Sequence, residues 1–295
     1  MYGRPCDAVG MVIARIVFGL MLTASTLGAA EPFFFVQMSD PQFGMCTKNR
    51  EFSQETANFE FAMANLNRMR PAFVVVTGDL VNEVGNKSQI DEYHRVAAKL
   101  DRGIPLYSVA GNHDVGNEPT PESLARYRER FGRDYYTFKS GEFLGIVLNS
   151  SLIQHPEKAT EDAAKQELWL KAELERARSA GVRQMAVFQH IPFFLEKADE
   201  ADQYFNIPLA TRKRFLELFA AYGMNYIFAG HYHRNSYGEA GALKMVTTGP
   251  VGMPLGKETS GMRVGRVSES GIDSRYYGLG NVPSQLDNAL FAKPK

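Results

Sequence analysis

The sequence predicts an α/β protein built from two facing mixed sheets that are flanked by helices. Between residues 33 and 230, apolar runs rich in β-branched and aromatic residues alternate with amphipathic stretches, which is typical of a layered α/β domain. After residue 233 the pattern changes to short strand-like runs with glycine-rich turns, which predicts a second, more antiparallel sheet facing the first. Five short polar motifs each follow an apolar run, so we expect them at strand ends.

Short apolar runs predict the strands. The first sheet is expected to contain residues 33–36, 73–76, 106–109, 186–188 and 226–228. A hairpin around Ser140-Gly141 is expected from residues 135–139 and 143–149. The second sheet is expected to contain residues 243–247, 262–267 and 274–277.

Amphipathic stretches with suitable end residues predict the helices. They are expected over residues 52–70, 88–100, 161–180 and 211–222, with a further helix starting at Thr120-Pro121. Ser88 followed three residues later by Asp91 resembles a capping box, and Pro121 suits a first helical position. Gly181 and Gly223 follow the last two helices, where glycine commonly ends a helix.

Length and charge limit the class of protein. The 295 residues carry 33 basic and 33 acidic side chains, so the formal charge is zero. This balance argues against a surface that coats nucleic acid. We find no linker that divides the chain, and we expect one domain over residues 31–280 followed by a polar, loose tail over residues 281–295.

The first 30 residues predict a signal peptide. Arg4 and Arg15 precede an uncharged apolar run over residues 16–27, and small residues follow before Glu31, as at a cleavage site. The run is shorter than the roughly 20 residues of a membrane-spanning helix. We therefore expect an exported protein, periplasmic or secreted, without a stable membrane span after cleavage. The alternative is an anchor formed by the uncleaved segment. The mature chain would keep one cysteine, Cys46, and therefore no internal disulfide.

The five polar motifs supply side chains that divalent metals bind. They are Asp40-Pro41-Gln42, Gly78-Asp79, Gly111-Asn112-His113-Asp114, His190 and Gly230-His231-Tyr232-His233. Carboxylates, amide oxygens and imidazoles are common metal ligands. Each motif alone has an ordinary explanation as a turn or a satisfied loop residue, but five in a row at strand ends predict a metal centre. The candidate ligands are Asp40, Gln42, Asp79, Asn112, His190, His231 and His233.

The residue types suggest how such a centre would work. Asp79 has two carboxylate oxygens and can bridge two ions, and two ions about 3.5–4 Å apart hold a phosphoryl group and activate a water for in-line attack. His113 is the candidate proton donor to the leaving oxygen. His231 and His233 alternate with Tyr232, so both imidazoles face one side of an extended segment.

This order of motifs resembles the calcineurin-like metallophosphoesterase superfamily over roughly residues 33–267. The resemblance implies a four-layer αββα sandwich and two divalent ions, of Mn, Mg, Fe or Zn. It implies a first ion at Asp40, Gln42, Asp79 and His233, and a second at Asp79, Asn112, His190 and His231. His113 would be the catalytic acid. Longer matching runs around these motifs resemble a subgroup of phosphatases that act on phosphoserine or phosphothreonine.

Three positions depart from the superfamily pattern. Gln42 replaces a histidine, and an amide oxygen suits Mg²⁺ or Mn²⁺ better than zinc. Asn82 and Glu83 stand where related protein phosphatases carry an aspartate that orients the catalytic histidine and an arginine that binds phosphate. Asp114 is the candidate to orient His113, and Arg234 is the candidate to contact the phosphate oxygens.

The expected function is hydrolysis of phosphomonoesters by a hydroxide held between two metal ions. The substrate would be a small phosphorylated molecule or a phosphoprotein. Two alternatives stay open: a phosphodiesterase acting on nucleotides or lipid headgroups, and a non-catalytic, metal-bound scaffold. We expect ordinary surface or helix-face positions for His94 and His155 and a packing role for Trp169. Residues 193–195 would line either a substrate mouth or the core.

Overall fold

The computed structural model describes residues 1–3 and 31–292. The chain divides into two units, Met1–Ala30 and Glu31–Lys295, and the fold below is that of the second unit. The apolar run of the predicted signal peptide lies outside the described residues. In the part of the chain that is described, no helix combines the length and the apolar character that crossing a bilayer requires.

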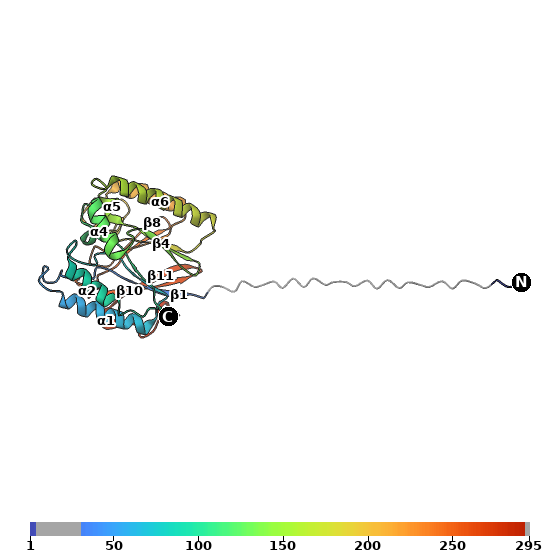
Figure 1. The fold of residues 1–295 in the computed structure, drawn as a ribbon, viewed down its shortest axis with the longest axis horizontal. Coiled ribbons are helices and arrows are strands. Elements are labelled where there is room, and N and C mark those ends of the chain that lie inside the picture. Colours follow the sequence, from blue (N-terminus) through green and yellow to red (C-terminus); the bar gives the residue numbers. More distant parts are fainter. Residues whose placement is uncertain (4–30, 293–295) are drawn as a thin grey trace. The chain divides into compact units, whose positions relative to one another are not determined.

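Two mixed sheets form the centre of the second unit (Figure 1). The first sheet has the order β11-β10-β1-β2-β3, and the second has the order β4-β5-β6-β7-β9-β8. The strands of the first are β1 (Phe33–Met38), β2 (Phe73–Val76), β3 (Leu106–Ser108), β10 (Gly261–Ser268) and β11 (Gly271–Gly278). Those of the second are β4 (Tyr136–Ser140), β5 (Phe143–Val147), β6 (Met185–Phe188), β7 (Tyr226–Ala229), β8 (Ser236–Ala240) and β9 (Leu243–Thr247).

The strand pairing corrects the expected division between the sheets. β1, β2 and β3 are parallel, and the late strand β10 pairs antiparallel with β1, placing Val36 opposite Val264. β6 and β7 belong to the second sheet, where β9 pairs parallel with β7. β8 was not expected, and residues 262–267 and 274–277 complete the first sheet. A short alternating sequence predicts a strand but not its partner, because tertiary packing decides the partner.

Helices cover both outer faces of the sheets. The long helices are α1 (Ser53–Met69), α2 (Lys87–Ala97), α4 (Pro121–Phe131), α6 (Thr160–Ser179) and α7 (Leu209–Ala221), and the short ones are α3 (Asn112–Val115), α5 (Ser150–Gln154), η1 (Leu279–Asn281) and η2 (Asn288–Phe291). Figure 1 shows α1 and α2 on one side of the sheets and α6 on the other. The predicted start of α2 was wrong, because Asn86 is its N-cap and accepts a hydrogen bond from the Gln89 N–H at 3.3 Å.

Three apolar clusters separate the four layers. Val74 and Val76 of β2 pack with α1, whereas Phe73 and Val75 face the other sheet, as the two-residue period of a strand requires. Rings of Phe35, Phe73 and Phe188 fill the space between the sheets. A third cluster joins the second sheet to α6 and α7. The predicted α/β fold with two flanked sheets is therefore confirmed.

Residues after Asn281 pack on the first sheet. Phe291 stacks on Phe34 of β1 with ring centroids 6.3 Å apart, and the Arg266 guanidinium lies 5.0 Å from the centroid of the Phe291 ring. Val282 and Leu286 also pack against the apolar cluster between α1 and the first sheet. The expected loose end is therefore held in place up to residue 292.

Candidate metal centre

The five polar motifs follow the carboxyl ends of β1, β2, β3, β6 and β7. The first three strands belong to one sheet and the last two to the other, so the motifs approach from two sheets and not from a single sheet edge. Within each sheet these strands run parallel, which puts their carboxyl ends at the same edge. The edges of the two sheets therefore bring the candidate ligands together.

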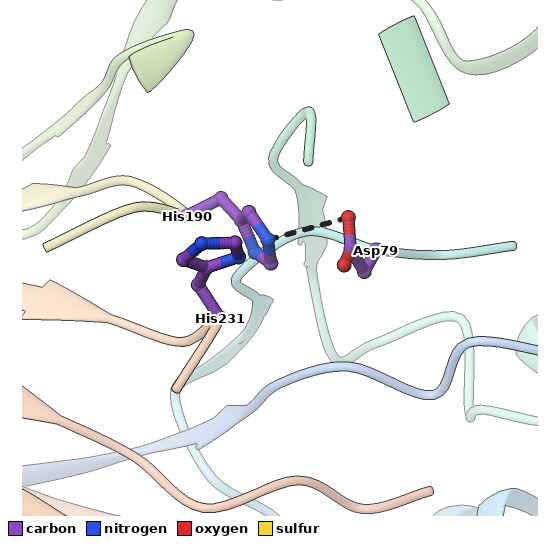
Figure 2. A group of neighbouring side chains, drawn as sticks. All are labelled: Asp79, His190 and His231. Atoms are coloured by element: carbon purple, nitrogen blue, oxygen red, sulfur yellow. Dashed lines mark ion pairs between the residues drawn. The ribbon is translucent and has the colours of Figure 1, made fainter. Parts of the chain in front are cut away.

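Two buried groups of side chains share Asp79. Asp79, His190 and His231 form one group, and Asp40, Asp79 and His233 form the other; within each group the candidate ligand atoms lie within 4.8 Å of one another. His190 Nε2 lies 3.3 Å from Asp79 Oδ1, and His233 Nε2 lies 3.2 Å from Asp40 Oδ1. Figure 2 shows the imidazoles of His190 and His231 beside the Asp79 carboxylate. One carboxylate thus stands between two sets of ligands.

The two candidate amide ligands lie beside these groups. Asn112 Oδ1 is 3.0 Å from His190 Nε2. Gln42 donates from its Nε2 to Asn82 Oδ1 at 3.2 Å, whereas its buried Oε1 has no hydrogen-bond partner within the described residues. Because a buried carbonyl oxygen without a partner is costly, Gln42 Oε1 fits a position that a cation completes.

Each candidate histidine ligand contacts a backbone carbonyl through one ring nitrogen. His190 Nδ1 is 2.9 Å from the Thr77 oxygen, His231 Nε2 is 3.1 Å from the Tyr204 oxygen, and His233 Nδ1 is 2.6 Å from the Met253 oxygen. Donation of this N–H fixes the tautomer and leaves a lone pair on the other nitrogen, which is the usual arrangement around protein metal sites. The donor set therefore fits two divalent ions.

Backbone geometry aims these side chains. Asp40, Gln42, Asp79, His231 and His233 all have positive φ, between 39° and 68°. Such conformations are costly for residues other than glycine, and they gather where function requires a set orientation. Glycines let the loops approach: a Cβ on Gly111 would overlap the Asp79 backbone nitrogen, and one on Gly230 would overlap the Ser39 hydroxyl.

The site concentrates negative charge. Burial raises the pKa of Asp79, but the charges of His190 and His113 outweigh it and hold the pKa below the usual range. Burial lowers the pKa of His190, yet Asp79 and Asp40 raise it to about 9. Burial and His190 lower the pKa of His231 to about 4. Burial also raises the pKa of Asp40, but the charges of His233 and His190 hold that pKa below its usual range. Two ionised carboxylates thus occupy a buried pocket, which favours cations.

His113 lies beside this pocket, and its Nε2 makes no hydrogen bond within the described residues. Its backbone N–H donates to Asp79 Oδ1 at 2.9 Å, and its Nδ1 is 2.7 Å from the Asn82 oxygen. We expected Asp114 to orient this ring. In the structure, the Asn82 carbonyl contacts the His113 ring instead. The Asp114 carboxylate accepts instead from the backbone N–H groups of Leu80, Val81 and Gly111, so it fixes the loops after β2 and β3.

Other predicted positions have structural explanations. Arg234 donates to the Leu255 oxygen at 2.7 Å and lies over the Tyr232 ring. Phe193 and Phe194 are buried in the core, which excludes a substrate mouth for them. His94 is exposed and stacks on Phe131.

Sequence reasoning missed the carbonyls of Thr77, Asn82, Tyr204 and Met253, and also the Tyr204 side chain. A backbone carbonyl carries no residue identity, so no sequence signal marks it.

Comparison with known proteins identifies the class. A family model described as Calcineurin-like phosphoesterase matches residues 35–235. The chain belongs to this family and is a metallophosphoesterase with the ligand groups of a two-metal site. The sequence-based family, fold and enzyme class are confirmed.

Individual relatives indicate the kind of phosphoesterase. The serine/threonine-protein phosphatase CPPED1 from Homo sapiens is 38% identical over 264 residues, covering 84% of each chain. The structure of a dimetal phosphatase from Danio rerio has a TM-score of 0.63 at 16% identity, covering 84% of this chain and 97% of that one. A purple acid phosphatase from yellow lupin has a TM-score of 0.65 at 14% identity, covering 86% of this chain and 52% of that one. The protein is thus a phosphatase, and its substrates are phosphorylated.

Proposed function

We propose that this protein is a dinuclear phosphomonoesterase. The observation that carries the proposal is the position of Asp79. This residue belongs to both buried ligand groups, and its carboxylate accepts a hydrogen bond from the backbone N–H of His113. A single carboxylate thereby links the two cation positions and the candidate acid.

The residues divide between two cation positions. Asp40, Gln42, Asp79 and His233 would hold one ion, and Asp79, Asn112, His190 and His231 the other. The unpartnered Gln42 Oε1 and the carbonyl-bound histidines support this division. The first set has one imidazole among oxygen ligands, and we therefore propose Mn²⁺ or Mg²⁺ there.

His113 acts on the leaving group. When bound, the two ions neutralise phosphoryl charge and activate water. The Asn82 carbonyl accepts the Nδ1–H of the His113 ring and fixes its plane, so that Nε2 can hold the proton that the departing alkoxide takes. The buried surroundings of Asp79 keep bulk water from competing for these contacts.

The substrate class is proposed from the relatives of the protein, and its location is proposed from the N-terminal sequence. The relatives named serine/threonine-protein phosphatase support phosphoserine or phosphothreonine esters as substrates. The N-terminal sequence pattern supports export with cleavage before Glu31. N-terminal sequencing of the protein recovered from its native cells is the check, and a mature chain that starts at Met1 would contradict export.

Turnover measurements test the catalytic proposal. With added Mn²⁺, we expect p-nitrophenyl phosphate to be cleaved faster than bis(p-nitrophenyl) phosphate. With phosphoserine, whose alkoxide leaving group needs a proton, His113→Gln should lower kcat by about 10²–10⁴-fold because proton donation is lost, while bound metal stays unchanged. Faster cleavage of the diester would favour the diesterase alternative. Full turnover by His113→Gln would refute the assigned acid, and no turnover by the metal-loaded wild type would favour the scaffold.

A further inference from the structure

The loop between β6 and α7 brings an exposed aromatic residue to the metal centre. Tyr204 is 55% exposed. Its hydroxyl accepts from Asn112 Nδ2 at 3.3 Å, and its ring centroid lies 4.9 Å from that of His231. Tyr204 therefore contacts two candidate ligands from the solvent side, where an entering substrate must pass.

This loop is tied together by polar contacts of Glu200 and Arg212. The Glu200 carboxylate accepts the backbone N–H groups of Leu195, Glu196 and Lys197 and the amide of Asn206. Arg212 is fully buried, and its guanidinium donates to the carbonyls of Ala198, Glu200 and Ile207. Tyr204 thus sits on a support that the chain's own hydrogen bonds hold in place.

A cleft with several amide side chains in its lining opens beside Tyr204. It has a volume of about 310 Å³, and its lining includes Asn117, Gln154, His155 and Gln203. Asn117 Oδ1 accepts from Asn112 Nδ2 at 2.8 Å, so the cleft begins one side chain away from a candidate ligand. Side-chain amides both donate and accept hydrogen bonds, which suits a polar group better than a hydrocarbon chain.

We propose that Tyr204 contacts the substrate and that this cleft takes the alcohol part of the ester, which must carry hydrogen-bonding groups. The proposal rests on the phosphomonoesterase function above. The Tyr204 ring packs against the alcohol, and its hydroxyl hydrogen-bonds near the ester oxygen, while the amides of Gln154 and Gln203 contact polar groups further out. A phosphorylated residue within a peptide has this chemistry, because its peptide bonds supply donors and acceptors. A long alkyl phosphate does not.

Steady-state kinetics of Tyr204 variants test this substrate contact. The substrates are a phosphoserine pentapeptide and hexyl phosphate, each with Mn²⁺. We expect the wild type to have the lower KM for the peptide. Tyr204→Ala should raise the KM for the peptide by about tenfold and the KM for hexyl phosphate much less. Tyr204→Phe, which keeps the ring, should show a smaller rise. Gln203→Ala should also raise only the KM for the peptide.

A matched control separates this effect from a general surface change. Tyr237 on β8 is 53% exposed and hydrogen-bonds Glu239, and Tyr237→Ala should leave both KM values unchanged. Metal analysis should find the same bound metal in every variant. Unchanged peptide KM in both Tyr204→Phe and Gln203→Ala, with an active wild type, would overturn the cleft assignment alone. An inactive metal-loaded wild type would instead refute the phosphomonoesterase function.

Discussion

Gly252→Ala is predicted to damage the metal centre, because the added methyl group would push two neighbouring loops apart. Gly252 lies next to Met253, whose carbonyl contacts His233, and it is not itself a ligand. An added Cβ would lie 2.6 Å from the backbone oxygens of Asp40 and Pro41, about 0.8 Å short of the 3.4 Å at which ordinary contact begins. Backbone oxygens cannot rotate away as a flexible side chain would, so one of the two loops must move.

The surrounding hydrogen bonds decide what moves. Val251 N–H donates to the Ser39 oxygen at 2.8 Å and Gly252 N–H to the Asp40 oxygen at 3.1 Å, so the loops are coupled. We expect Asp40 and His233 to be forced apart by up to about 1 Å, which can reduce kcat by about 10²-fold. The steric cost should also lower the free energy of unfolding by roughly 1–3 kcal/mol.

The assay compares Gly252→Ala with Gly280→Ala. A Cβ on Gly280 has nothing within 4 Å, so this control should keep wild-type turnover of p-nitrophenyl phosphate and wild-type metal content. Thermal unfolding and metal analysis complete the measurement. If Gly252→Ala binds metal and turns over as the wild type does, the loops are not as closely coupled as we argue.

Three further changes test other parts of the structure. Gln42→Leu removes an oxygen that has no partner within the described residues, so it should reduce bound metal, and the lost hydrogen bond to Asn82 should cost the chelated protein only about 0.5–1.5 kcal/mol; equal metal content would contradict its role as a ligand. Arg212→Met should lower the free energy of unfolding by roughly 2–4 kcal/mol in urea melts, because three carbonyls lose their buried donor. Arg214→Met, which removes a surface pair with Glu167 and a guanidinium contact with the Phe215 ring, should cost less than about 1 kcal/mol, and similar losses for both would refute the distinction. Burial and the Glu55 carboxylate raise the pKa of the Cys46 thiol from 9.0 to about 11, so at pH 8 alkylation by iodoacetamide should be about a hundredfold slower than for an ordinary thiol and should speed up with pH until about 11. A pH-independent rate above pH 9 would contradict that shift.

The sequence could predict which candidate ligands lie together, because their identity is carried by side chains. Asp79, His190 and His233 stand in short motifs at strand ends, and strand ends were readable from the apolar runs before them. The five motifs together indicated a metal centre, although no single motif did so.

The sequence could not show which groups orient the catalytic elements. Asp114 follows His113 directly, yet successive residues of the short helix α3 point in different directions, and the two side chains have different partners. Tyr204 belongs to no motif, and its position depends on polar contacts of Glu200 and Arg212 that only the folded loop reveals. Likewise, the sequence of β10 predicts a strand, but its pairing with β1 depends on contacts between residues far apart in the chain.

The pairing of β1 with β10 has a consequence for the order of assembly. Asp40 is the first candidate ligand along the chain. The strand that pairs with one edge of β1, however, is β10, which lies near the opposite end of the chain. Closing so long a loop is slow, and a nascent chain still lacking β10 leaves one edge of β1 unpaired. We therefore expect the pocket that gathers the cations to be completed late in folding.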